Sequence, residues 1–551
     1  MADFGLSGSA SGSSMRAKLV SFAMCFGFAI IAVKAGFVAI AGPEPKTGVA
    51  RVFDEPVRRA DIVDRNGELL ATSVDVYSLF ADPRAIWDPA EVATGIASVF
   101  PDTDIDSLTA SLSDRDRAFV WVRRGLTPRQ RSAVYDLGLE GLGFREESRR
   151  AYPRGTLAGH VLGYAGTDGQ GLAGVEYEMD KRLAAGGEPM KLTINSNIQF
   201  ALEAELAAAA GEYDIEGGAG VVLDARNGEV LGMASWPPID PNRAHTLSGD
   251  DPARLNRAAS AVYELGSVFK PLTIAAGLDS GAISPSDRFA VREPIVISGR
   301  RITDTHRIAG PATPAEIVSH SSNIGTVKVA IMLGARRQQE ILEKLGLFER
   351  SPIELAGSAS PIVPAKFDDI HAATISYGHG IAVSPIAFAT AFSVFANGGE
   401  VVDPTIILGS TRARNARRVI SAPTAALVTQ MLRHAVTDGT GTRAEVAGYR
   451  VAGKTGTAEK PVPGGYSRTA NMASFASIFP SNSPEYVVLV VLDAPKIGPG
   501  RGRTASWNAA PTVGRVIERI APMLGVEPQF DDYDQRDNPF VRSVADRRST
   551  L

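Results

Sequence analysis

Ser267-Val268-Phe269-Lys270 is the stretch that decides the fold of this 551-residue chain. From Val268 to Leu278 the chain is mostly apolar, which predicts a buried helix with Pro271 in its first turn, where a missing N–H costs little. Residues three apart share one face of a helix, so Lys270 is expected beside Ser267. A helix N-terminus also favours developing negative charge. The stretch therefore predicts a serine that is activated by a neighbouring lysine.

Two further motifs follow in a fixed order, Ser321-Ser322-Asn323 and then Lys454-Thr455-Gly456-Thr457. Each pattern has a second copy, at Lys46-Thr47-Gly48 and at Ser506-Trp507-Asn508, but neither copy fits the order. No lysine other than Lys270 has a serine three residues before it. Order and spacing together make three incidental matches a poor explanation.

The chemistry of acyl transfer accounts for these residue types. A serine, a lysine one turn later, a Ser/Asn pair and a Lys-Thr-Gly strand are the groups of a serine acyl-transfer site. An ammonium group cannot accept a proton, so Lys270 must be neutral or must transfer its proton in concert. Burial and a nearby positive charge both lower the pKa of a lysine. We expect Lys454 to supply that charge.

The segment Lys454-Thr455-Gly456-Thr457 follows Tyr449-Arg450-Val451-Ala452 and is rich in β-forming residues. This composition predicts an edge strand that lines the cleft. We expect Gly456 to let substrate approach the backbone closely. The lysine and the two threonine hydroxyls of the motif are expected to hold a terminal carboxylate.

In these motifs the chain resembles the class B penicillin-binding proteins, which are membrane-anchored peptidoglycan transpeptidases, and most of all the FtsI-type septal enzymes of cell division. The resemblance runs from the apolar N-terminal segment to about residue 520. It extends to four further stretches: Arg59 to Ala71, Arg150 to Pro153 with Gly159 to Gly163, Gly174 to Glu176, and Gly439 to Thr442.

The resemblance implies a role for each residue of the first two motifs. Ser267 is implied to be the acylated nucleophile and Lys270 its general base. Ser321 is implied to relay protons to or from the leaving D-alanine amine, and Asn323 to hold the donor peptide backbone. No cofactor and no metal are implied.

The resemblance also implies how the third motif acts. Lys454 completes the electrostatics of the site and, with Thr455, Gly456 and Thr457, binds the substrate. The backbone N–H groups of Ser267 and Thr457 are implied to form the oxyanion hole. The implied partners are stem peptides ending in D-Ala-D-Ala, β-lactams, a membrane glycosyltransferase of the shape, elongation, division and sporulation family, and other membrane proteins of the division complex.

Composition excludes several other classes of protein. The formal net charge of −4 indicates no strong attraction to nucleic acid. The seven histidines are scattered, without the spacing of a metal site. The single cysteine, Cys25, lies in the apolar N-terminal segment, so disulfides and a cysteine nucleophile are excluded.

The N-terminal segment predicts a membrane anchor. Leu19 to Ala41 is predominantly apolar, and its 23 residues would span about 34 Å as a helix. Arg16 and Lys18 precede it, which favours a cytoplasmic N-terminus. A cleaved signal peptide is the alternative, because Ala39-Ile40-Ala41 resembles a cleavage site. Length favours the anchor, and the resemblance implies a bacterial inner-membrane protein with a periplasmic catalytic domain at the division septum.

Five regions are expected along the chain: a cytoplasmic tail (1–15), a transmembrane anchor (16–42), a non-catalytic pedestal domain of the dimerisation type (43–190), a transpeptidase domain (191–525) and a disordered tail (526–551). The fold class expected is α/β (α+β), with an antiparallel sheet flanked by helices as in the penicillin-binding and β-lactamase-like enzymes. The clearest predicted elements are a strand–turn–strand at Asp61 to Ala71, a capped helix from Thr127, a helix at Gln199 to Ala210, a hairpin at Gly220 to Ala234, a buried strand at Tyr486 to Leu492 and a final helix at Thr512 to Ala521.

Several alternative functions share the three motifs. A D,D-carboxypeptidase or β-lactamase would pass the acyl group to water, but neither usually needs a large anchored pedestal. A β-lactam receptor would need cytoplasmic signalling sequence, and a bifunctional enzyme would need a glycosyltransferase module before Leu192. The intact motifs argue against an inactive scaffold. An elongation enzyme is the nearest alternative to a septal one. The loop Ser376 to Gly380 is expected to form a cleft wall, with His379 in a structural role.

Overall fold

The computed structural model describes residues 18–22, 24–30, 32–34, 58–410, 416–496 and 502–530, with the side chain of Arg468 left out. Within these ranges no helix is both long enough and apolar enough to cross a membrane. The predicted cytoplasmic tail (1–15) lies outside the described residues, as does part of the predicted anchor (16–42). Both therefore stay predictions.

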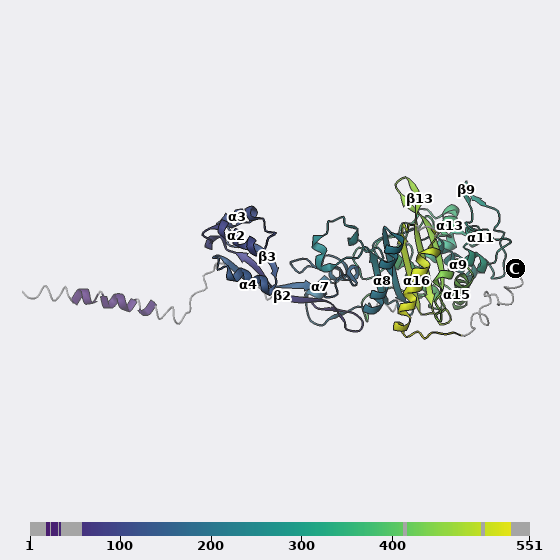
Figure 1. The fold of residues 1–551 in the computed structure, drawn as a ribbon. Coiled ribbons are helices and arrows are strands. Elements are labelled where there is room, and N and C mark those ends of the chain that lie inside the picture. The colour runs from purple at the N-terminus through teal and green to yellow at the C-terminus, as the bar shows by residue number, and fades with distance from the viewer. Residues whose placement is uncertain are drawn as a thin grey trace, which may run out of the picture. The chain divides into compact units, whose positions relative to one another are not determined.

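The centre of the catalytic domain is a five-stranded sheet in the order β12-β13-β14-β6-β7, in which all neighbouring strands are antiparallel (Figure 1). The predicted hairpin is confirmed, because β6 and β7 are joined through a turn that contains Asn227 and Gly228. The Lys-Thr-Gly strand, β12, is an edge strand, as predicted. The strands are β6 (Gly217–Asp224), β7 (Val230–Trp236), β12 (Ala452–Val462), β13 (Gly465–Phe479) and β14 (Tyr486–Asp493).

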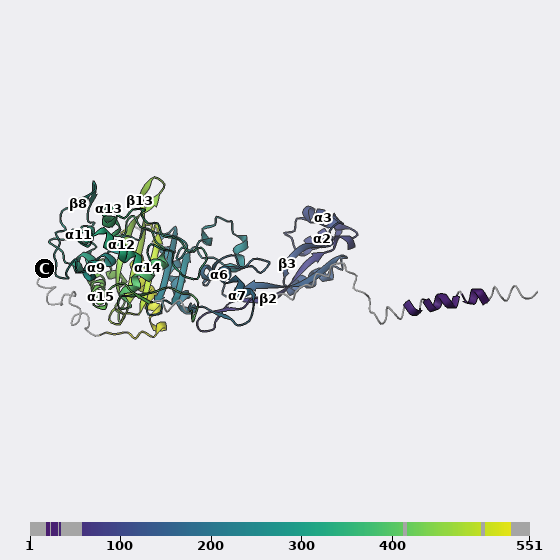
Figure 2. The same cartoon turned by 180° about the vertical axis from the view of Figure 1, so that it is seen from behind.

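Both faces of this sheet are covered by helices, which is why β14 is apolar at successive positions. Alternate residues of a strand point to opposite faces. Helices α8 and α16 cover one face, and α14 and α15 pack against the other, with α9 beside α15 (Figures 1 and 2). Val487, Leu489 and Val491 belong to the core on the α14 side, whereas Val488, Val490 and Leu492 belong to the core under α8 and α16.

The helices confirm the predicted elements of the catalytic domain. The predicted helix at Gln199 lies inside α8, and the predicted C-terminal helix is α16, which packs on the sheet and on α8. The longer helices are α8 (Ser196–Tyr213), α9 (Lys270–Asp279), α10 (Pro314–His320), α11 (Asn323–Leu333), α12 (Ala335–Lys344), α13 (Asp369–Ile375), α14 (Pro385–Phe392), α15 (Ala422–Thr437) and α16 (Ala509–Ile520). Two short hairpins complete the domain, β8 (Ile295–Ile297) with β9 (Arg300–Ile302) and β10 (Glu400–Val402) with β11 (Ala416–Arg418).

The pedestal is built on one long strand, β2, which pairs with β1, β3 and β4. The pedestal contains a separate apolar core, which includes Leu79, Ile96 and Phe100. The predicted capped helix is α4, where Thr127 and Gln130 form a capping box. The elements are β1 (Ile62–Val63), β2 (Leu69–Ala81), α2 (Pro89–Val99), α3 (Ile105–Ser113), β3 (Val120–Leu126), α4 (Pro128–Asp136), β4 (Leu142–Ala151) and β5 (Met190–Lys191).

The predicted strand–turn–strand at the start of the pedestal also contacts the catalytic domain. Asp64 closes the turn between β1 and β2 by accepting from the N–H groups of Asn66 and Glu68 at 2.8 and 2.9 Å. Its other carboxylate oxygen accepts from the N–H of Ser196, the first residue of α8, at 3.0 Å. Burial opposes the charge of Asp64, but these hydrogen bonds outweigh it and lower its pKa.

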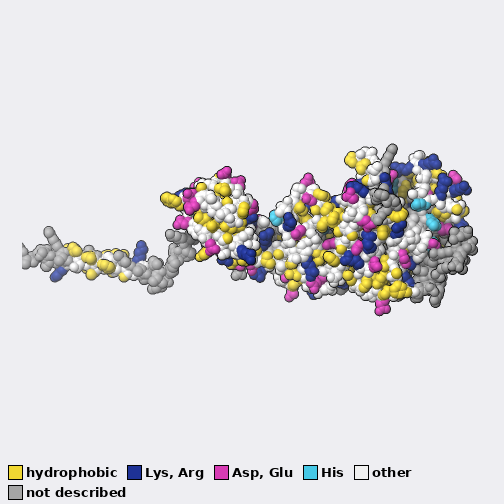
Figure 3. Space-filling model, viewed as in Figure 1, with side chains coloured by type: hydrophobic (Ala, Val, Ile, Leu, Met, Phe, Trp, Pro, Cys, Tyr) yellow, Lys and Arg dark blue, Asp and Glu magenta, His cyan; other side chains and the backbone are white. Residues whose placement is uncertain are grey.

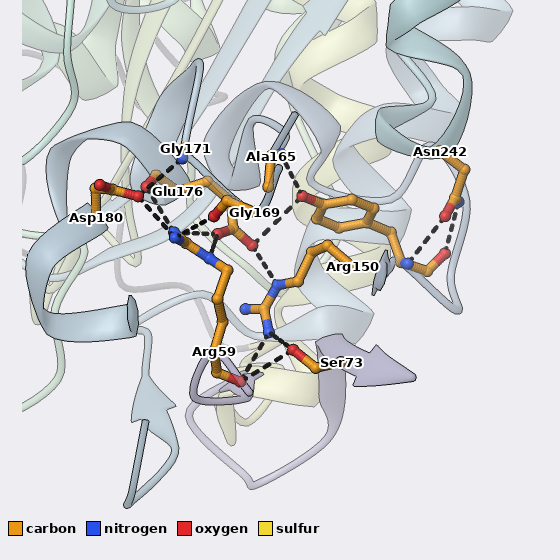
Figure 4. Close-up of polar contacts among 10 residues, drawn as sticks. Arg59, Ser73, Arg150, Ala165, Gly169, Gly171, Glu176, Asp180 and Asn242 are labelled. Carbon is orange, nitrogen blue, oxygen red and sulfur yellow. Dashed lines mark hydrogen bonds and ion pairs between the residues drawn. The ribbon is translucent and has the colours of Figure 1, made fainter. Parts of the chain in front are cut away.

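A buried polar cluster lies where three short helices, α5 (Gly159–Leu162), α6 (Gly174–Glu178) and α7 (Asp180–Ala184), meet the pedestal (Figure 4). Glu176 is fully buried and is 2.8 Å from Arg59 Nη2 and 2.6 Å from Arg150 Nε. Tyr152 donates to the same carboxylate at 3.4 Å, and Asp180 lies 2.6 Å from Arg59. We call these five residues the linker cluster. It joins the chain before β1, the end of β4 and helix α6.

Residues 526–530, which the sequence placed in a disordered tail, contact the catalytic domain. The N–H of Gln529 donates to Gly448 O at 2.8 Å, and its side-chain carbonyl accepts from Arg450 and Asn482 at 2.7 and 2.8 Å. The prediction of disorder is therefore wrong for residues 526–530, whereas residues 531–551 lie outside the described ranges, so for them it stays a prediction.

Candidate active site

The three motifs meet in one cleft of about 890 Å³ at the β12 edge of the sheet. Ser267, Ser321, Asn323, Thr455 and Thr457 all line it. Lys270 and Lys454 lie behind this lining and are fully buried. The tertiary structure thus brings together the residues that the sequence predicted, although they come from segments that are far apart in the chain.

Ser267 lies at the N-terminal end of a helix, as predicted. It belongs to a short 3₁₀ turn, Gly266–Phe269, which continues directly into α9 at Lys270. Gly266 has φ 63° and donates to the carbonyl of Gly378 at 3.2 Å. A Cβ at Gly378 would lie 2.1 Å from the Gly266 oxygen, so the loop Ser376 to Gly380 can pack here only with glycine.

Lys270 hydrogen-bonds to Ser321. Its Nζ donates to Ser321 Oγ at 3.0 Å and to the Ser321 carbonyl oxygen, whereas no hydrogen bond between these described residues joins it to Ser267. Ser321 has φ 62° and follows α10 as its C-terminal cap. Burial, and then the charge of Lys454, hold the pKa of Lys270 well below its usual range. The lysine is therefore suited to accept a proton.

The Nζ of Lys454 lies among three oxygen atoms of Thr440 and Thr455. Its Nζ donates to the Thr455 carbonyl at 3.1 Å, to Thr455 Oγ1 at 3.2 Å and to Thr440 Oγ1 at 3.4 Å. The two threonine hydroxyls are themselves 2.8 Å apart. Burial lowers the pKa of Lys454 to about 7. Thr440 lines the cleft and was not among the predicted site residues, although the sequence marked its segment, Gly439 to Thr442, as family-like.

Gly456 and Thr457 have structural contacts that the sequence did not predict. A Cβ at Gly456 would lie 2.2 Å from the Leu265 oxygen and 2.3 Å from Ser474 Oγ, and Gly456 does not line the cleft. The glycine is therefore required for packing of β12 against the turn before Ser267, and its expected role in the close approach of substrate stays a prediction. The hydroxyl of Thr457 accepts from the N–H of Ala505 at 3.0 Å.

Asn323 is held by the loop after β9. Its Nδ2 donates to the carbonyl of Thr303 at 2.9 Å. The next residue in that loop, Asp304, accepts from Ser322 Oγ at 2.6 Å and from the N–H of Ile324 at 3.0 Å. Sequence reasoning missed Asp304, because it lies in none of the motifs and is brought to them only by folding.

The loop Ser376 to Gly380 forms a wall of the cleft, as predicted. His379 Nδ1 lies 3.1 Å from a carboxylate oxygen of Glu264, and its ring packs on Tyr466 with centroids 4.9 Å apart. Tyr466 donates to Glu264 at 3.0 Å. Burial and the Glu264 carboxylate raise the pKa of Tyr466 to about 12. Glu264, three residues before Ser267, is a further site residue that no pattern indicated.

The rim of the cleft on the β9 side is basic. Basic and histidine side chains gather over this part of the surface (Figure 3), and Arg300, Arg301, His306 and His320 line the cleft there. Within the described ranges, no group of His, Cys, Asp and Glu residues has the arrangement of a metal site.

The fold and the cleft define a serine-type acyl-transfer enzyme. Residues 218–518 match the family model of the penicillin-binding protein transpeptidase domain, and residues 54–212 match that of the penicillin-binding protein dimerisation domain. The chain belongs to the penicillin-binding protein transpeptidase family, and its two matched domains make it a class B member.

Individual relatives resemble the chain over most of its length. It is 42% identical to a probable peptidoglycan D,D-transpeptidase FtsI from Caulobacter vibrioides, over 85% of this chain and 82% of the relative. It is 30% identical to stage V sporulation protein D from Bacillus subtilis, over 94% of this chain and 88% of the relative. The crystal structure of penicillin-binding protein 3 from Mycobacterium tuberculosis with aztreonam is similar, with a TM-score of 0.68, 27% identity, and coverage of 86% of this chain and 98% of that chain.

Proposed function

We propose that this chain is a peptidoglycan D,D-transpeptidase that links stem peptides through an acyl-serine intermediate and is inhibited covalently by β-lactams. One observation carries the proposal. A half-buried serine at a helix N-terminus opens onto a cleft that is backed by two fully buried lysines, Lys270 and Lys454. Family membership and the relatives named as D,D-transpeptidases support the same function.

The first half of the reaction acylates Ser267. Its Oγ attacks the carbonyl carbon of the penultimate D-alanine, and its proton passes to neutral Lys270. The peptide C–N bond then breaks, and the leaving D-alanine amine receives a proton through Ser321, which accepts a hydrogen bond from Lys270 at 3.0 Å. This proton path needs a neutral lysine, and the lowered pKa of Lys270 supports that requirement.

The second half passes the acyl group to an amine of another stem peptide. The amine attacks the ester carbonyl and loses a proton to the same Lys270–Ser321 pair; the ester C–O bond then breaks, and the Ser267 oxygen takes a proton from Lys270 and is released as the free hydroxyl. In both halves the backbone N–H groups of Ser267 and Thr457 stabilise the oxyanion, and losing one such donor typically costs roughly a hundred- to a thousandfold in rate. Asn323 holds the donor peptide.

We assign recognition of the donor stem peptide to the third motif, Lys454-Thr455-Gly456-Thr457. Lys454 supplies positive charge, and the hydroxyls of Thr455 and Thr457 bind the terminal carboxylate. Both threonines line the cleft, which supports this assignment. Gly456 contributes by allowing β12 to pack against the turn that carries Ser267.

The direct test is the intact mass of the purified chain, followed for hours after addition of benzylpenicillin. We expect a long-lived adduct on the wild type and none on Ser267→Ala. Ser506→Ala is the matched control, because Ser506 also lines the cleft but belongs to the Ser-x-Asn copy that is out of order. An adduct that disappears quickly while the drug is consumed would favour a hydrolase.

We further propose that the reaction takes place at the division septum, in a protein anchored in the bacterial inner membrane with its catalytic domain in the periplasm. The 42% identity to a relative named FtsI supports the septal role. The proposed partners are a membrane glycosyltransferase of the shape, elongation, division and sporulation family and other division proteins. Depletion should give filamentous cells, whereas rounded cells would indicate the elongation alternative.

A further inference from the structure

Asp304 lies behind the second motif and uses both of its carboxylate oxygens there. Ser322 donates to Oδ2 at 2.6 Å, and the backbone N–H of Ile324 donates to Oδ1 at 3.0 Å. Both donors belong to the start of α11, the helix that begins at Asn323. A carboxylate at this place also interacts favourably with the helix dipole.

The loop that carries Asp304 is fixed on either side of these hydrogen bonds. The preceding carbonyl, of Thr303, accepts from the side chain of Asn323 at 2.9 Å. One residue earlier, Ile302 is buried in a small apolar cluster with Val327 of α11 and Ala373 of α13. Asp304 is therefore part of a built contact between β9 and α11.

The contact between β9 and α11 affects Ser321 through the adjacent residue, Ser322. The hydroxyl of Ser322 donates to Asp304 and accepts from the N–H of Gly325 at 2.9 Å, so it caps α11 while bound to the carboxylate. Ser321, one residue earlier, has the left-handed φ of 62°, which L-residues rarely adopt. Fixing Ser322 holds Ser321 in the conformation in which its Oγ and carbonyl oxygen meet Lys270.

Two charged groups act on Lys270 from opposite directions. Lys454 on β12 lowers its pKa, as burial also does, whereas Asp304, behind β9, raises it. Ser321 presents only its hydroxyl and carbonyl oxygens to the lysine. Asp304 thus opposes burial and the charge of Lys454, but does not outweigh them, so the pKa of Lys270 stays lowered.

We infer that Asp304 is a positioning residue of the acyl-transfer site, which clamps Ser322 so that Ser321 meets Lys270 and which places a negative charge near that pair. This inference rests on the proposed function, because it concerns the same proton path. Asp304 itself is not among the residues that line the cleft, although its neighbours Thr303 and Thr305 are.

The test compares variants of the full chain by the rate of acylation with a fluorescent penicillin from pH 5 to pH 10, with thermal unfolding measured in parallel. Asp304→Ala should slow acylation by roughly 10- to 100-fold, because hydrogen bonds to a charged group are lost. The acylation rate of Asp304→Asn should fall by a smaller factor than that of Asp304→Ala. Glu293→Gln is the matched control, because it removes one negative charge from an exposed position near the same hairpin.

The pH profile separates positioning from a purely structural role. Acylation needs neutral Lys270, so its rate falls at low pH with the pKa of that lysine. Without the Asp304 charge that pKa falls further. The acid limb of the pH profile, which is the fall in acylation rate at low pH, should therefore move to lower pH in Asp304→Asn. Ser322→Ala removes the clamp but keeps the charge, so it should slow acylation without moving the limb.

Three outcomes would overturn the inference. The first is an unshifted acid limb in Asp304→Asn, and the second is an acylation rate of Asp304→Ala equal to that of the wild type. The third is a loss of rate that matches the loss of folded protein in all variants. Failure of the proposed function would look different, because the wild type itself would then form no adduct at Ser267, and the inference would fall with it.

Discussion

Glu176 in the linker cluster and Lys270 behind the cleft are both fully buried ionisable side chains, but their surroundings differ. Glu176 is paired with Arg59 and Arg150 at 2.8 and 2.6 Å. Among the described residues, neither Lys270 nor Lys454 forms an ion pair, and the pKa of each is lowered. A buried charge must be paired, or else it tends to become neutral.

This contrast separates a region that stabilises the fold from a region that supplies reactivity. The linker cluster pairs its carboxylates with arginines and so connects the pedestal with the short helices before the catalytic domain. The site behind the cleft instead holds two lysines that form no ion pair among the described residues, which costs stability and favours the neutral form of Lys270 that proton transfer needs. Changes in the two regions should therefore differ in the sign of their effect on stability.

The largest expected effect is on the reaction. Lys270→Met should slow acylation by benzylpenicillin by roughly 10²- to 10⁴-fold, because the general base is removed while the buried volume is kept. Stopped-flow or quenched mass measurements would give the rate. Lys328→Met, on helix α11, which packs against α9, lies outside the cleft lining; it serves as control and should acylate like the wild type. A rate for Lys270→Met within threefold of wild type would exclude Lys270 as the base.

The second largest expected effect is a loss of stability that leaves the acylation rate of the folded protein unchanged. Glu176→Ala leaves two buried arginines without their shared carboxylate, so the free energy of unfolding should fall by about 3–5 kcal/mol. Asp180→Asn is the matched control, since Asp180 contacts the same Arg59 but is 34% exposed, and it should cost about 1 kcal/mol or less. Urea titration measures both values. The folded fraction of each variant should acylate at the wild-type rate, and a large loss of that rate would mean that the cluster also shapes the cleft.

The smallest expected effect is a gain of stability, opposite in sign to the loss expected for Glu176→Ala. Lys454 has a folded-state pKa of about 7 against an ordinary 10.5, so between these pH values the unfolded chain binds more protons and stability rises with pH. This stability is lost as pH falls toward 7. Lys454→Met removes the titration and should stabilise the chain by roughly 1–4 kcal/mol at pH 7.

The difference between Lys454→Met and the wild type should narrow toward pH 10, as urea titrations at several pH values would show. Acylation should be lost in the same variant, because the positive charge of the third motif is gone. A variant that is less stable than the wild type at pH 7 would contradict the comparison between the two regions.

The local elements and most of the site residues can be predicted from the sequence alone. A continuous apolar run indicated β14, capping residues indicated the start of α4, and the three motifs named the serines, lysines and threonines that meet at the cleft. These are features of spacing within one segment, which helix and strand periodicity make readable.

Which of these groups touch depends on the tertiary structure. Lys270 hydrogen-bonds to Ser321, 51 residues away, and not to the serine one turn before it. Gly456 serves the packing of β12 against the carbonyl of Leu265, and Asp304 and Thr440 join the site from segments without a catalytic motif. Such contacts depend on how strands and helices pack, and local periodicity carries no information about which distant segments become neighbours. The buried environment that lowers the pKa of both lysines arises for the same reason, because burial is a property of the assembled fold.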